Sequence, residues 1–121
     1  MENFEVLKPF GPSIVKIKMP NKMIEEINEY VDKVIQDENK MKDLNEGDKL
    51  IGKVQQEFLM EINFMKQIKW AEFLASNVSN WAKMELNKEI RNFQLIKSWV
   101  VRQFKNDYNP VHWHTGDISG V

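Results

Sequence analysis

The feature that most constrains the fold is a β-type run near the C-terminal end of the chain, residues 93–104. β-branched and aromatic residues dominate this run, and its middle, Trp99–Val101, is apolar on both faces of an extended strand. A strand that is covered on both sides has this composition, whereas a strand with one face in water alternates apolar and polar residues. We therefore expect a long strand here, covered by other parts of the chain.

Two earlier segments have the periodicity of amphipathic helices. Residues 21–35 follow Pro20, and Asn21 is the predicted N-cap. Their apolar residues recur at spacings of three and four, as a buried helical stripe requires: Met23, Ile24, Ile27, Tyr30, Val31, Val34 and Ile35. Residues 66–88 have a second stripe, widened by aromatic residues. Both stripes are predicted to pack in the core, because helical spacing explains them without a cofactor.

The remaining segments are predicted from turn residues and polarity. Phe4–Pro9 is expected to be extended, and Ser13–Lys18 is β-branched and bounded by turn residues, which predicts a strand. Gln36–Lys49 is almost wholly polar, so we expect a mobile surface loop. Leu50–Met65 alternates only in part, and a short strand or an irregular packed segment would both fit.

Composition excludes several classes of function. The 121 residues suit one domain, residues 1–121, and the net charge of −1 gives no sign of nucleic-acid binding. The chain has no cysteine and no apolar run that approaches the roughly 18 residues of a membrane span, and its first residues lead us to expect no signal peptide. We therefore expect a cytoplasmic protein. The last residues, Ile118–Val121, read as the middle of a strand, so we expect the N-terminal part of a longer protein.

Both histidines of the chain lie close together near its C-terminal end. A turn at Lys105–Asp107 is predicted to lead into a partner strand, Tyr108–His114, in which residues two apart share a face. His112 and His114 would then present their imidazoles side by side, with Asp117 after a Thr-Gly turn. Two imidazoles and one carboxylate are the ligands of a mononuclear non-heme iron site.

A structural role for these histidines is the alternative. A lone histidine is usually a surface residue or a hydrogen-bonded core residue. Two adjacent imidazoles that face one way are costly if both become charged, and a bound metal removes this cost by holding them neutral. Spacing alone does not decide between a metal site and a structural pair.

The sequence from Trp99 to Val121 resembles a known family. Its Asn109-Pro110-Val111-His112-Trp113-His114 run, followed by Asp117-Ile118-Ser119-Gly120-Val121, is similar to the first metal-ligand region of iron(II)/2-oxoglutarate-dependent oxygenases of bacteria and tailed phages. The resemblance implies an α+β fold, with N-terminal helices packed on the start of a double-stranded β-helix, a distorted jelly roll. The barrel would be incomplete, with residues 1–121 ending after the first metal-ligand strand.

The resemblance also implies a ligand set. His112 matches the family's first histidine, and His114 falls where the acid usually stands, so either His114 or Asp117 is the second ligand. The family's distant histidine and the basic residue that binds the cosubstrate carboxylate have no counterpart after His114. Trp99, Arg102 and Gln103 on the preceding strand are expected to line the cosubstrate pocket.

The function that the resemblance implies is that of an iron(II)- and 2-oxoglutarate-dependent dioxygenase, a hydroxylase whose substrate the sequence does not identify. We expect these residues alone to be inactive. Two alternatives remain. A cupin-like metal-binding barrel also has His-x-His on a strand, but it places a glycine ahead of the first histidine and a glutamate after the second. A non-catalytic binding module would use a degenerate barrel of the same kind. The sequence does not indicate an oligomeric state.

Overall fold

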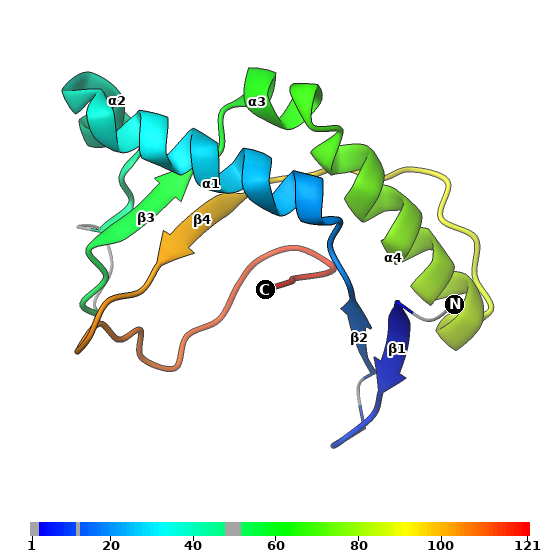
Figure 1. Ribbon diagram of the computed structural model, residues 1–121. Coiled ribbons are helices and arrows are strands. Elements are labelled where there is room, and N and C mark those ends of the chain that lie inside the picture. Colours follow the sequence, from blue (N-terminus) through cyan, green and yellow to red (C-terminus); the bar gives the residue numbers. More distant parts are fainter. Residues whose placement is uncertain (1–2, 12, 48–51) are drawn as a thin grey trace. The chain divides into compact units, whose positions relative to one another are not determined.

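The structure is a computed structural model that describes residues 3–11, 13–47 and 52–121 (Figure 1). The elements run in the order β1 (Phe4–Leu7), β2 (Ile14–Ile17), α1 (Asn21–Gln36), α2 (Glu38–Leu44), β3 (Gln56–Leu59), α3 (Ile62–Gln67), α4 (Trp70–Leu86) and β4 (Trp99–Arg102). The predicted α+β class is confirmed. Within the described ranges the strands form two antiparallel pairs, and these do not close into a barrel.

The chain divides into two compact units, which are described separately. The first contains the residues up to Glu26 together with Ile62–Gln94, and the second contains Ile27–Glu61 together with Leu95–Val121. Helix α1 begins in the first unit and continues in the second. None of the described helices is long and apolar enough to cross a membrane.

The first unit joins a β-hairpin to helix α4. Strands β1 and β2 pair antiparallel, with Phe4 opposite Ile17, which confirms the two extended segments predicted at this end of the chain. Two side-chain contacts tie the hairpin to the helix: Trp81 Nε1 donates a hydrogen bond of 2.9 Å to Ser13 Oγ, and Lys8 pairs with Glu85. The hairpin is therefore attached to α4 by both a hydrogen bond and an ion pair.

The second predicted helix, residues 66–88, is present but starts earlier and is interrupted. Helix α3 already begins at Ile62, and α4 follows it after a break at which Lys69 adopts a left-handed conformation with φ of 56°. No glycine or proline marks this break in the sequence, so periodicity alone could not place it. Helix α4 ends at Leu86 and is capped by Asn87, whose φ of 51° is a conformation that asparagine tolerates better than most residues.

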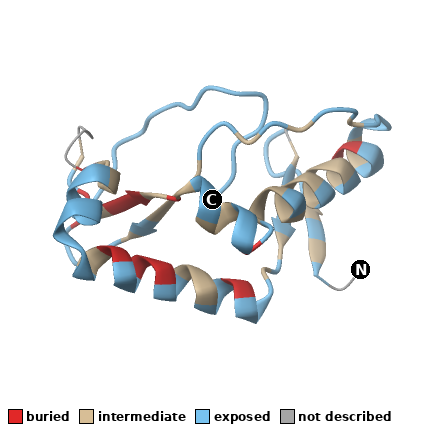
Figure 2. Cartoon of the chain, turned by 90° about the horizontal axis from the view of Figure 1, so that it is seen from above, coloured by how far each residue is buried: buried red, intermediate tan, exposed pale blue. Residues whose placement is uncertain are grey.

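The core of the second unit lies between α1 and the β3–β4 pair. Figure 2 shows buried residues along one side of α1 and on β3. Phe58, Val31 and Val34 are the largest fully buried side chains. The predicted stripe of α1 is thus confirmed in this part, because the residues at helical spacing are those that lose their contact with water.

Polar contacts fix α1 on the β3–β4 pair. Tyr30 Oη donates to the Leu59 carbonyl at 3.1 Å, and Arg102 Nη2 lies 2.8 Å from Asp32 and 3.3 Å from the Asn28 carbonyl. Arg102 is opposite Gln56 in the ladder, and Phe58 is opposite Val100. Because alternate residues share a face, the face with Phe58 and Arg102 is turned toward α1.

The two segments between the predicted helices have more regular structure than their polarity indicated. The predicted loop Gln36–Lys49 contains helix α2, whose N-terminus is capped by the Asp37 carboxylate bonding to the Asn39 and Lys40 amides; residues 48–49 lie outside the described part. A polar helix has no apolar stripe to reveal it, and the cap is its only local signal. For Leu50–Met65, a short strand was one of the two predicted alternatives, and β3 confirms it. Helix α3 also begins within this segment, and residues 50–51 lie outside the described part.

The strand predicted at residues 93–104 is confined to β4, and the predicted partner strand Tyr108–His114 is wrong. β4 pairs with β3 instead, and Tyr108 makes only an isolated bridge to Lys53. Pro110 lacks the N–H that a paired strand needs, which accounts for the loss of regular pairing after Tyr108. Val101 and Ile96 are exposed, so the strand is not covered on both faces as expected.

Candidate functional site

The turn that precedes the histidines is fixed by a buried carboxylate. Asp107 is only 8% exposed, and its carboxylate accepts hydrogen bonds from the Phe104 amide at 3.1 Å, the Gln55 amide at 3.4 Å and Gln55 Nε2 at 3.2 Å. The turn prediction is confirmed here, because Asn106 has φ of 69°. Asp107 thus joins the turn after β4 to the segment before β3.

A close backbone contact continues this attachment toward the histidines. Lys53 and Tyr108 exchange two backbone hydrogen bonds of 2.8 Å each. Gly52 lies against the same backbone: a Cβ atom at its position would be 2.3 Å from the Tyr108 oxygen and 2.8 Å from Pro110 Cδ. Only a glycine allows the two chains to approach so closely.

The structure brings His112 and His114 together. His112 Nδ1 lies 2.7 Å from the Pro110 carbonyl, so this nitrogen carries a proton and donates it. His112 Nε2 is then an acceptor in the neutral ring, and it lies 3.0 Å from His114 Nε2. The two rings meet edge to face, with centroids 4.8 Å apart. Both imidazoles are exposed to solvent.

Trp99 on β4 supports this pair. Its ring stacks on His114, with centroids 5.6 Å apart and planes inclined by 28°. Trp99 is therefore the one residue of the predicted cosubstrate pocket that the structure brings to the imidazoles. Arg102 is on the opposite face of the strand pair, bound to Asp32, and Gln103 donates to the Asp107 carbonyl at 3.2 Å.

Asp117 is not gathered with the two histidines. It is exposed and lies in a bend directly after Gly116, which has φ of 104°. Across the described part of the chain, no three His, Asp or Glu side chains are close enough together to hold a metal ion. Among the described residues, the structure therefore brings together two candidate nitrogen ligands, those of His112 and His114, without a third ligand.

Sequence reasoning missed one charged residue of this region, Glu57 on β3. Its side chain is only 6% exposed. Burial raises the pKa of the Glu57 carboxyl above its usual value, while the electrostatic influence of Lys97, His112 and His114 lowers this pKa and the charge of Glu46 raises it. The only signal in the sequence is an acid that immediately precedes two apolar residues of a short strand.

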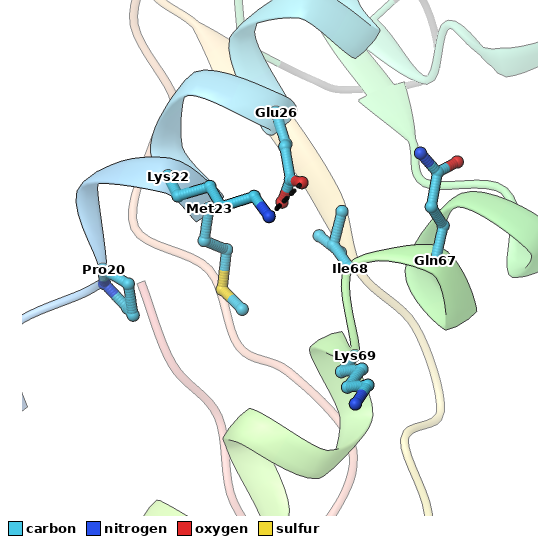
Figure 3. Close-up of a pocket in the computed structure, with 7 residues that line it drawn as sticks. All are labelled: Pro20, Lys22, Met23, Glu26, Gln67, Ile68 and Lys69. Carbon is cyan, nitrogen blue, oxygen red and sulfur yellow. Dashed lines mark ion pairs between the residues drawn. The ribbon is translucent and has the colours of Figure 1, made fainter.

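The first unit has an open hollow of about 320 Å³ between the start of α1 and the junction of α3 with α4 (Figure 3). Met23 and Ile68 contribute apolar surface, and Lys22 forms a 4.0 Å ion pair with Glu26 at the rim. None of the site residues predicted from the sequence lies there, so the candidate site is the histidine pair of the second unit.

Comparisons with known proteins add no relative. No protein-family model, curated protein or solved structure matches the chain. The function has to be argued from the geometry of the site and from the resemblance of residues 99–121.

Proposed function

We propose that this chain belongs to an iron(II)- and 2-oxoglutarate-dependent dioxygenase in which His112 and His114 are two of the metal ligands. The observation that carries the proposal is the distance of 3.0 Å between the two Nε2 atoms. The family resemblance of the surrounding residues supports iron rather than another divalent metal. A double-stranded β-helix is part of this proposal, with β4 as one of its strands.

The distance suits two neighbouring ligands of an octahedral metal. Imidazole nitrogens bind such metals at about 2.1 Å, and two bonds of that length at a right angle place the nitrogens about 3.0 Å apart. A tetrahedral angle would separate them by about 3.4 Å. Iron sites with two histidines and one carboxylate use neighbouring positions on one face of an octahedron and leave others open for substrates.

The surroundings of the pair also suit a metal site. The hydrogen bond from His112 Nδ1 to the Pro110 carbonyl selects the tautomer whose Nε2 has a free lone pair, as an outer hydrogen bond does in many metal centres. Trp99 packs against the His114 ring and limits its rotation. When bound, iron(II) couples the oxidative decarboxylation of 2-oxoglutarate to hydroxylation of a substrate. The protein residues hold and orient the ligands.

A metal titration tests the proposal. Each of the variants His112→Ala and His114→Ala is expected to bind cobalt(II), a redox-stable substitute for iron(II), at least about tenfold more weakly than the wild type, because one nitrogen ligand is lost. Calorimetry and the absorption spectrum of bound cobalt(II) measure this. The chain has only these two histidines, so the double variant has no imidazole left. Thr115→Ala, an exposed neighbour, is the matched control. Unchanged binding by the double variant would refute the site.

A second assay separates catalysis from binding. With the full-length protein, iron(II), 2-oxoglutarate and oxygen, the proposal expects formation of succinate that depends on both histidines. The alternative is a non-catalytic binding module, which is favoured by the exposure of the histidine segment and by the lack of a third ligand beside the histidines among the described residues. Histidine-dependent cobalt(II) binding without any iron-dependent succinate would favour that alternative.

A further inference from the structure

Glu57 and the imidazole pair lie on the same side of the β3–β4 pair. In the ladder, Glu57 is opposite Val101, and Leu59 is opposite Trp99. Residues two apart share a face of a strand, so Glu57 is on the same face as Trp99 and not on the face turned toward α1. His114 stacks on Trp99 and therefore lies on this face too.

The carboxylate of Glu57 is in an unusual position for a surface strand. The residue as a whole is only 6% exposed, and among the described residues its carboxylate makes no side-chain hydrogen bond or close ion pair. The groups that act on it electrostatically are Lys97 and the two histidines, which favour its charged form, and Glu46, which disfavours it. A buried negative charge acts over a longer range than an exposed one, because less water screens it.

We infer that Glu57 is a positioning residue of the proposed metal site: its carboxylate, on the face of the β3–β4 pair that carries the imidazole pair, favours a divalent cation there without itself being a ligand. This inference rests on the proposed function. A ligand role does not fit, because Glu57 does not form a group of three with the histidines in the described part of the chain. Its effect is electrostatic: it compensates part of the positive charge that a cation adds to the site.

Lys97 provides an internal test of this electrostatic role. Its Nζ lies 5.6 Å from the centre of the Trp99 ring, and it is exposed. Its positive charge attracts Glu57 and opposes a cation bound to the histidines. Removing this charge should therefore change the affinity for a cation in the direction opposite to that caused by removing the charge of Glu57.

The experiment measures cobalt(II) affinity for four proteins: the wild type, Glu57→Gln, Glu57→Asp and Lys97→Met. Glu57→Gln keeps the shape and removes the charge, and we expect affinity to fall about tenfold, the lower end of what outer carboxylates contribute in metal sites. Glu57→Asp keeps the charge and changes the shape, and we expect affinity within about threefold of the wild type. Lys97→Met should bind about threefold more tightly.

A purely structural role for Glu57 would reverse this order. Shortening the side chain to aspartate would then harm binding more than the isosteric glutamine. Thermal unfolding provides the second readout: Glu57→Gln should be at least as stable as the wild type, because it removes a buried, desolvated charge. Weaker binding without loss of stability is the expected combination.

The failures of the two proposals are distinguishable. If the wild type does not bind cobalt(II), or the double histidine variant binds it equally well, the metal site itself is refuted and the role of Glu57 with it. If binding requires the histidines but Glu57→Gln matches the wild type, or Glu57→Asp is the weaker variant, only the inference on Glu57 is overturned.

Discussion

Replacing Phe58 with alanine is expected to lower the free energy of unfolding by about 3–5 kcal/mol. Phe58 has 0% exposure and is the largest fully buried side chain described. Its removal takes away apolar contacts and leaves a cavity beneath α1 that the short β3–β4 pair cannot close by shifting. Since whole domains are stable by only about 5–15 kcal/mol, much of the stability of the second unit would be lost.

Urea unfolding measures this change, with the fluorescence of the tryptophans as the signal. Phe58→Leu is the graded variant and should cost only about 1 kcal/mol, because it retains most of the buried volume. Phe10→Ala is the matched control: Phe10 is 94% exposed, so its loss should change stability by no more than about 0.5 kcal/mol. Equal losses for Phe58→Ala and Phe10→Ala would contradict the core described here.

The helical parts of the fold were predictable because their signal is local. Met23, Tyr30, Val31 and Val34 recur at helical spacing, and each is buried in the structure. The periodicity of residues 66–88 likewise predicted a helix, but it showed neither the earlier start at Ile62 nor the break at Lys69. A left-handed conformation at a lysine depends on the packing of the surrounding structure, so the local sequence does not predict it.

The strand pairing was less predictable, because it depends on contacts far apart in the sequence. Residues 93–104 were expected to pair with the following residues across a tight turn, which is the commonest arrangement. The structure pairs β4 with β3, and these are separated by both α3 and α4. β3 has only four residues, so its alternation is too brief to distinguish it from irregular structure.

The candidate site, like the fold, was predictable where its residues are close in sequence and not where they are far apart. The closeness of His112 and His114 was expected from their spacing, and the structure brings them together, although on an irregular segment rather than on a strand. Glu57 could not be connected with them without the β3–β4 register. The contact of Gly52 with the histidine segment could not be predicted either, because only the fold shows which backbone a glycine lies against.

Replacing Gly52 with alanine is expected to destabilise the second unit by about 2–4 kcal/mol and to weaken cobalt(II) binding at the histidines about tenfold. The added Cβ would lie 2.3 Å from the Tyr108 oxygen, far inside contact distance, and 3.0 Å from Asn109 Cα. These are backbone atoms, so no side chain can rotate away to make room. The segment from Tyr108 to Pro110 has to move.

This movement breaks the two hydrogen bonds between Lys53 and Tyr108, and it displaces the Pro110 carbonyl that orients the His112 ring. The loss of stability and the loss of affinity therefore have one cause. Urea unfolding and a cobalt(II) titration measure them on the same samples. Gly120→Ala is the matched control, because a Cβ at Gly120 would meet no atom within 4 Å. If Gly52→Ala unfolds and binds as Gly120→Ala does, the backbone contact does not position the histidines, and their 3.0 Å separation has to be maintained by the Trp99 stack alone.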